Sequence, residues 1–92
     1  MDEKIRHDLT NRLASAAGHI KGIERMVADD AYCIDVIKQI QAVQAALNKV
    51  STIMLDNHLR TCVTTAIQGH DAEERERMLQ EVTSVFSVTA KQ

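Results

Sequence analysis

Proline is absent from this 92-residue sequence, and only three glycines are present. Because proline breaks helices and glycine weakens them, almost nothing in the chain interrupts helix formation. Tryptophan is also absent, and one tyrosine and one phenylalanine are the only aromatic residues, so the large core anchors of a β-sandwich are missing. Ala, Val, Ile, Leu and Met supply the apolar content. This composition predicts an all-α protein with a single domain over residues 1–92.

Long hydrophobic runs are lacking as well. No apolar stretch approaches transmembrane length, and the first ten residues, MDEKIRHDLT, lack the hydrophobic segment of a signal peptide. We therefore expect a cytoplasmic protein with no membrane partner, in which Cys33 and Cys62 stay reduced and available as ligands or redox groups. The net charge of −2 does not itself indicate nucleic-acid binding, but the acidic excess lies toward the C-terminal end. A basic face elsewhere is compatible with this distribution.

Apolar residues recur with helical spacing in three segments. The first covers residues 3–28, the second 31–68, and the third begins after Asp71 and extends for about 12–16 residues. Asp30 is predicted as the N-cap of the second helix and Gly69 as its C′ residue, while Asp71 and Glu74 form a D-x-x-E start for the third. The sequence thus predicts three helices per chain.

The second segment is too long for a small three-helix monomer. As one helix it would extend roughly 57 Å, so pairing with the same helix of a second chain is the most economical way to bury it. An antiparallel, two-fold arrangement is expected because C2 dimers are the commonest closed oligomers. The predicted assembly is an antiparallel four-helix-bundle dimer. Its heptad-like apolar positions are Val36, Ile40, Val43, Leu47, Val50 and Met54.

The stretch HLRTC places His58 and Cys62 four residues apart, on one face of a helix. Cys33 lies on nearly the same face but roughly 37 Å away along the helix, so one chain cannot bring all three to one metal. If two antiparallel helices cross near Ala45 and Ala46, Cys33 of one chain lies beside His58 and Cys62 of the other. Two thiolates and one imidazole suit Cu(I), whereas Zn(II) normally takes a fourth ligand. The sequence predicts two such shared sites per dimer.

Other interpretations of these residues remain open. Free cysteines are commonly buried as small hydrophobes, and a lone histidine is usually a surface residue. Cys33 and Cys62 could instead form a redox switch across the dimer, or the bundle could buffer metal without binding DNA. No nucleophile is paired with a base and an orienting acid, so we expect neither an enzyme nor a small-molecule substrate.

Three stretches carry a family resemblance: NRLASAAGHIKGIERMV, DAYCIDVIKQIQAVQAALNKV and MLDNHLRTC. Together they resemble the copper-sensitive operon repressor (CsoR) family over roughly residues 9–70. The resemblance implies a dimer that pairs into a tetramer and binds operator DNA without a helix-turn-helix. It implies a Cu(I)-responsive repressor that leaves DNA on metal binding and derepresses copper efflux and homeostasis genes.

Related repressors sense nickel or cobalt, formaldehyde, or persulfides. The resemblance therefore keeps two alternatives, a nickel-, cobalt- or zinc-responsive repressor and a cysteine-based persulfide or redox sensor. Persulfide sensors lack the middle histidine, and the formaldehyde and nickel/cobalt types typically lack the last cysteine. The combination of Cys33, His58 and Cys62 matches the copper branch.

The resemblance also implies residues around the ligands. Tyr32 would orient the neighbouring cysteine, or else pack at the start of the helix. Glu81 is the candidate for a carboxylate that supports the ligands, with Met78 or Leu79 as alternatives at the matching position. His7 would be a possible fourth donor favouring Ni(II) or Zn(II) over Cu(I), and otherwise a solvated surface histidine.

The same resemblance implies DNA contacts. Arg12 matches an arginine of the family's DNA-binding surface, Lys49 matches a basic residue of the second helix, and Lys21 and Arg25 could extend that face. Each could equally be a solvated surface charge. Ala17 stands where relatives carry a further arginine, so the basic patch has one positive charge fewer. Phosphate contacts from several subunits would give salt-sensitive binding, with DNA shape contributing to recognition.

Overall fold

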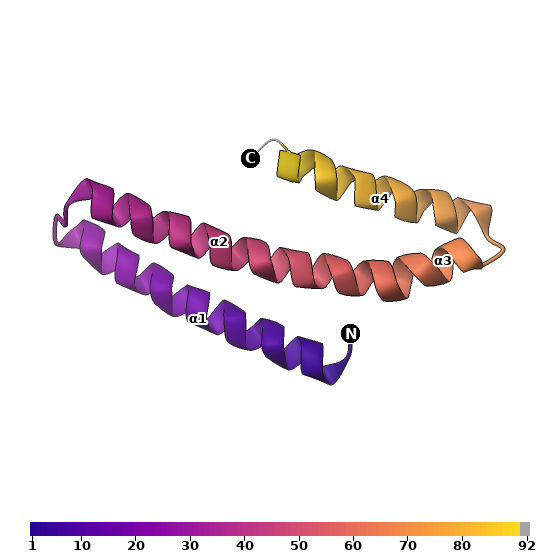
Figure 1. The fold of residues 1–92 in the computed structure, drawn as a ribbon, viewed down its shortest axis with the longest axis horizontal. Coiled ribbons are helices and arrows are strands. Elements are labelled where there is room, and N and C mark those ends of the chain that lie inside the picture. The colour runs from indigo at the N-terminus through magenta and orange to yellow at the C-terminus, as the bar shows by residue number, and fades with distance from the viewer. Residues whose placement is uncertain (91–92) are drawn as a thin grey trace. The chain divides into compact units, whose positions relative to one another are not determined.

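The computed structural model describes residues 1–90, and these residues are helical except at the N-terminus and in two short connections (Figure 1). The elements are α1 (Glu3–Ala28), α2 (Cys33–His58), the π-helical turn η1 (Leu59–Val63), α3 (Thr64–Gln68) and α4 (Ala72–Ala90). No strand occurs among residues 1–90, which confirms the all-α prediction. Because α2, η1 and α3 follow one another without interruption, the described chain contains the three predicted helical segments.

The helix α1 has the predicted bounds, but its end differs from the prediction. Asp30 adopts a left-handed conformation with φ of 54°, and its N–H donates to the carbonyl oxygen of Val27 at 3.2 Å. The N–H of Ala31 donates to the carbonyl oxygen of Met26 at 2.9 Å. These two bonds are those of a Schellman motif, with Asp30 at C′. The prediction that Asp30 caps the second helix is therefore wrong, and α2 begins at Cys33.

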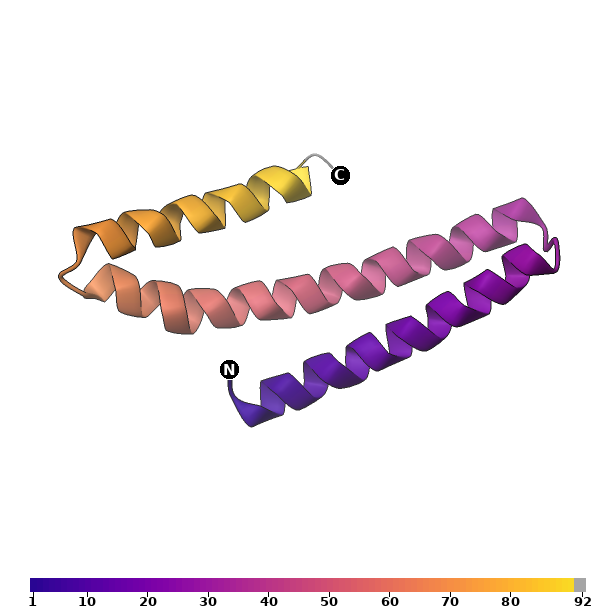
Figure 2. The same ribbon diagram turned by 180° about the vertical axis from the view of Figure 1, so that it is seen from behind.

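Two compact units are present, residues Met1–Met54 and the part of the chain from Leu55 onward. In the first unit, α1 and α2 run antiparallel side by side (Figures 1 and 2), and a hydrogen bond of 2.6 Å joins His19 Nε2 to Gln39 Oε1 between them. The side chains that are buried in this unit lie at seven-residue intervals on each of the two helices. They are Leu9, Ala16, Val36, Val43 and Val50.

A second set of apolar side chains in the first unit remains exposed. On α2 the heptad-like stripe divides, because one half faces the core and the other half is more than one-third exposed. On α1 the same division leaves residues at seven-residue intervals in solvent. The exposed set, called the outer apolar face below, comprises Leu13, Ile20, Val27, Ile34, Ile37, Ile40, Leu47 and Met54. Within a single chain, only half of the apolar residues at the heptad-like positions of α2 are therefore buried.

In the second unit, α4 contacts both η1 and α3, and Val63 and Ala66 are buried. Asp71 caps α4 as predicted, since its Oδ1 accepts the N–H groups of Glu73 at 3.0 Å and Glu74 at 3.2 Å. Gly69 is the C-cap residue of the preceding helix and is extended, with φ of −75° and ψ of 175°, so the prediction that Gly69 is the C′ residue is wrong.

The helix α4 has 19 residues and is longer than predicted. No glycine or proline follows Gly69, so nothing in the sequence ends the helix early. No helix among the described residues is both long and apolar enough to span a membrane.

Candidate metal centre

The HLRTC stretch contains the junction between α2 and the π-helical turn. His58 is the last residue of α2 and is half-buried, whereas Cys62 lies within η1 and is an exposed free thiol. Because a π-helical turn is wider than an α-helical turn, the spacing between His58 and Cys62 is not that of the regular helix assumed in the sequence-based prediction. The hydroxyl oxygen of Thr61 lies 3.6 Å from Cys62 Sγ, beside the candidate donor.

Cys33 is the first residue of α2 and is also an exposed free thiol. No three His, Cys, Asp or Glu side chains gather as a metal site within the described part of one chain. One chain therefore supplies a pair of candidate donors, His58 and Cys62, and a separate single donor, Cys33. These three residues therefore form no three-donor site within the described part of one chain.

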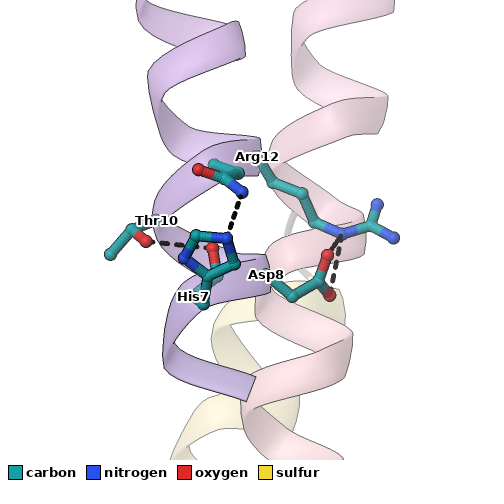
Figure 3. A network of polar contacts seen from close by, with 5 residues as sticks. His7, Asp8, Thr10 and Arg12 are labelled. Atoms are coloured by element: carbon teal, nitrogen blue, oxygen red, sulfur yellow. Dashed lines mark hydrogen bonds and ion pairs between the residues drawn. The ribbon is translucent and has the colours of Figure 1, made fainter. Parts of the chain in front are cut away.

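The remaining predicted site residues are mostly at the surface. Tyr32 is exposed at the entry to α2, where its carbonyl oxygen accepts the N–H of Val36 at 3.2 Å, and Glu81 is exposed on α4. His7 lies on α1, with its Nε2 3.2 Å from Asn11 Nδ2 (Figure 3). It belongs to no cluster of three metal-ligating side chains among the described residues.

Arg12, the first of the predicted DNA-binding residues, is paired with an acidic neighbour. Its Nε lies 3.1 Å from both carboxylate oxygens of Asp8, while its terminal nitrogens point away from this carboxylate (Figure 3). Lys21, Arg25 and Lys49 are exposed on α1 and α2. The first unit thus carries all four predicted DNA-binding side chains, each accessible from solvent.

A groove of the first unit runs beside Arg12. Polar residues at four-residue intervals on α1 line it, which is a helical-face pattern that could have identified them from the sequence. The sequence-based prediction did not include these polar residues or Asp8. The lining consists of Asn11, Arg12, Ser15, Ala16, His19 and Ala46.

Comparison with known proteins assigns the family. The family model described as metal-sensitive transcriptional repressor matches residues 5–88. The chain belongs to this repressor family. Membership confirms the predicted resemblance and the prediction of a repressor rather than an enzyme.

Several members of this repressor family are similar to this protein over most of its chain. The copper-sensing transcriptional repressor CsoR of Mycobacterium tuberculosis (strain ATCC 25618 / H37Rv) is 48% identical over 80 residues, which cover 86% of this chain and 67% of the relative. The structure of the copper-sensing repressor CsoR with Cu(I) from Geobacillus thermodenitrificans NG80-2 matches with a TM-score of 0.86 at 33% identity, covering 98% of this chain and 91% of the other. The nickel-responsive transcriptional regulator InrS matches with a TM-score of 0.74 at 35% identity, covering 87% and 90%.

Proposed function

We propose that this protein is a cytoplasmic, Cu(I)-responsive transcriptional repressor whose metal site is shared between two antiparallel chains. The observation that carries the proposal is the alignment of the candidate donors with the outer apolar face. Cys33 is seven residues before Ile40 in the exposed series Ile40, Leu47 and Met54, and His58 follows Met54 by four residues. Donors on the same stripe as unpaired apolar side chains are suited to meet donors of another chain.

A second copy of this chain is the occupant that best fits the outer apolar face. Exposed Ile, Leu and Met at heptad spacing favour burial against another helix of the same periodicity. In an antiparallel pair, the start of α2 in one copy lies beside the end of α2 in the other. Cys33 of one chain would then approach His58 and Cys62 of its partner, with the small Ala45 and Ala46 near the crossing. Pairing of such dimers would give the tetramer that the family resemblance implies.

The donor chemistry fits Cu(I). Cys33 and Cys62 are free exposed thiols, and the His58 imidazole completes a soft three-donor set. Bound Cu(I) would supply the link between the α2 helices of two chains. Tyr32, directly before Cys33, and Glu81 on α4 are proposed to orient the donors. The copper-sensing relatives named above support this choice of metal.

A nickel- or zinc-responsive repressor is the second candidate, supported by the similarity to InrS. Ni(II) or Zn(II) would need a fourth donor, and His7 is the residue proposed for it. A third candidate is a persulfide or redox sensor, since both cysteines are free thiols. It requires the two sulfurs but not His58.

DNA binding is proposed for the exposed cations of the first unit: Arg12, Lys21, Arg25 and Lys49. These basic side chains, repeated in the symmetry-related copies, would attract the DNA phosphates. The DNA affinity would therefore fall steeply with rising salt concentration. Metal binding would release DNA provided that the metal binds the DNA-free state more tightly than the DNA-bound state.

The test begins with operator sequences selected from a random duplex library by the metal-free protein. Cu(I) or Ni(II) is then titrated into the labelled complex, and fluorescence anisotropy follows DNA release. We expect stoichiometric release by Cu(I) and loss of that response in His58→Ala. Unchanged DNA affinity with Cu(I) fully bound would contradict the proposal. A His58→Ala variant that still releases DNA with persulfide donors would instead favour the sulfur-based sensor.

A further inference from the structure

The π-helical turn between the candidate donors is bonded in a distinctive way. The backbone N–H of Thr64 is shared between two carbonyl oxygens, that of Leu59, five residues earlier, and that of Thr61, three residues earlier. The carbonyl oxygen of Leu59 also accepts the Thr64 hydroxyl at 2.6 Å. The five-residue spacing that defines a π-helix is therefore made by the Thr64 hydroxyl and by one branch of the Thr64 N–H bond.

Three other threonines, close to this turn or in α2, use the four-residue spacing of an α-helix. Thr61 donates to the carbonyl oxygen of Asn57 at 2.8 Å, and Thr65 donates to that of Thr61 at 2.7 Å. Thr52, in the regular part of α2, donates to the carbonyl oxygen of Asn48 at 2.9 Å. Each of these bonds spans four residues. The five-residue reach of the Thr64 hydroxyl follows the π register of the turn.

The hydroxyl gives the π register a bond that a purely aliphatic side chain would not provide. In a regular α-helix, the N–H of Thr64 would pair with the carbonyl oxygen of Arg60. A threonine hydroxyl in such a helix commonly bonds to the carbonyl four residues earlier, so it would move to Arg60 as well. The bonds to Leu59 therefore favour the wide turn over a regular helix at this position.

The width of the turn affects the direction in which Cys62 projects. In an α-helix with 3.6 residues per turn, residue i+4 lies about 40° past residue i around the axis. A wider turn has more residues per turn, so it rotates Cys62 back around the axis relative to its place in a regular helix and changes its direction with respect to His58. We propose that Thr64 is a positioning residue that holds the π-helical turn and thereby aligns His58 and Cys62 as a metal-binding pair. This inference rests on the proposed metal site, although the register itself is a property of the metal-free chain.

The decisive variant is Thr64→Val, which removes the hydroxyl and keeps a β-branched side chain of similar shape. Thr64→Ser restores the hydroxyl, and Thr52→Val is the matched control because it removes a four-residue bond from regular helix. Backbone carbon chemical shifts and amide hydrogen exchange of residues 59–64 report the register in the metal-free protein. Competition with a chromogenic Cu(I) chelator reports affinity.

For Thr64→Val we expect shifted backbone signals and faster exchange confined to residues 59–64. We expect Cu(I) affinity to fall about three- to tenfold, as for the loss of one hydrogen bond between neutral groups. Thr64→Ser and Thr52→Val should stay near the parent protein in the backbone signals of this turn and in Cu(I) affinity.

Unchanged backbone signals in metal-free Thr64→Val would overturn the positioning role, as would unchanged Cu(I) affinity in a variant whose turn has changed register. An equal loss of affinity in Thr52→Val would also overturn it, because the effect would then be general helix weakening. If the parent protein fails to bind Cu(I), the proposed function is rejected. The backbone signals of metal-free Thr64→Val then decide whether the hydroxyl holds the turn.

Discussion

Arg12 is a cation with an acidic competitor for any phosphate it contacts. Its Nε is 3.1 Å from both oxygens of Asp8, and both side chains are about half exposed, at 43% and 50%. Exposed pairs of this kind contribute little to stability, so breaking this one should leave folding nearly unchanged. The same carboxylate repels a phosphate approaching Arg12. If Arg12 contacts DNA as proposed, Asp8 would limit the DNA affinity at this position.

We predict that Asp8→Asn binds DNA about two- to fivefold more tightly at low salt, because it frees Arg12 and removes a negative charge. Fluorescence anisotropy with a labelled random-sequence duplex at several salt concentrations measures the change. Asp56→Asn is the matched control, since Asp56 pairs in the same way with Arg60 Nε at 3.1 and 3.0 Å. An equal gain in both variants would show that net charge alone is responsible, and no gain in Asp8→Asn would contradict a role for Arg12.

The sequence located the three candidate donors but not the geometry around them. Helical spacing was sufficient to place Cys33 and His58 on nearly the same face of the second helix, roughly 37 Å apart along it. The π-helical turn was missed, because it depends on whether the Thr64 hydroxyl bonds to Leu59 or Arg60, and no sequence pattern distinguishes these carbonyls. The shared site itself stays a prediction, since a second chain must provide its third donor.

At the scale of elements, the connection between α1 and α2 contains a residue in an unfavourable conformation. Asp30 has φ of 54° as the C′ residue of the Schellman motif. The left-handed region costs a residue with a side chain roughly 1–2 kcal/mol, with Asn and Asp less penalised than most, whereas glycine adopts it freely. The connection is therefore less stable than it would be with a glycine at the C′ position.

We predict that Asp30→Gly raises the free energy of unfolding by about 0.5–1 kcal/mol, after allowance for the greater flexibility of glycine in the unfolded chain. Urea unfolding followed by circular dichroism measures it. Asp29→Gly serves as the control, because Asp29 has φ of −94° and gains nothing from a glycine. A stabilised Asp29→Gly, or a destabilised Asp30→Gly, would contradict the predicted cause.

Most helix bounds followed from simple signals, and the errors have identifiable causes. The residues 3–28 were predicted as a helix and form α1, because an apolar stripe runs through a segment with no proline. Asp30 was misassigned because aspartate is favoured both as an N-cap and, after glycine and asparagine, in left-handed positions. The length of α4 was underestimated because a β-branched ending weakens helix propensity without preventing a helix.

At the scale of the whole molecule, the proposed antiparallel dimer would account for both the outer apolar face and the separation of the candidate donors. A chain that leaves Ile40, Leu47 and Met54 exposed also leaves Cys33 without His58 and Cys62. A second antiparallel copy would bury these apolar side chains and would bring its own His58 and Cys62 beside Cys33. Each site would then draw Cys33 from one chain and the pair His58 and Cys62 from the other, so the two halves of the site can be inactivated separately.

We predict that Cys33→Ala and Cys62→Ala, each unable to bind Cu(I) tightly alone, recover binding when unfolded together and refolded as a mixture under reducing conditions. A mixed dimer holds one intact site, formed by Cys33 of the Cys62→Ala chain with His58 and Cys62 of the Cys33→Ala chain. Random pairing makes half of the dimers mixed, so about a quarter of the parent's tight sites should return. Chelator competition counts these sites.

The mixture of His58→Ala with Cys62→Ala is the control that separates a shared site from nonspecific rescue. Both substitutions fall in the same half of the proposed site, so in every mixed dimer each Cys33 meets a partner that lacks either the imidazole or the thiolate. We expect no tight sites from this mixture, although its proteins and total donor content closely match those of the recovering one. Recovery in both mixtures would mean that the three donors need not come together in one site. Recovery in neither, with parent-like dimers present, would mean that Cys33 does not act across the interface and that the apolar face serves assembly alone.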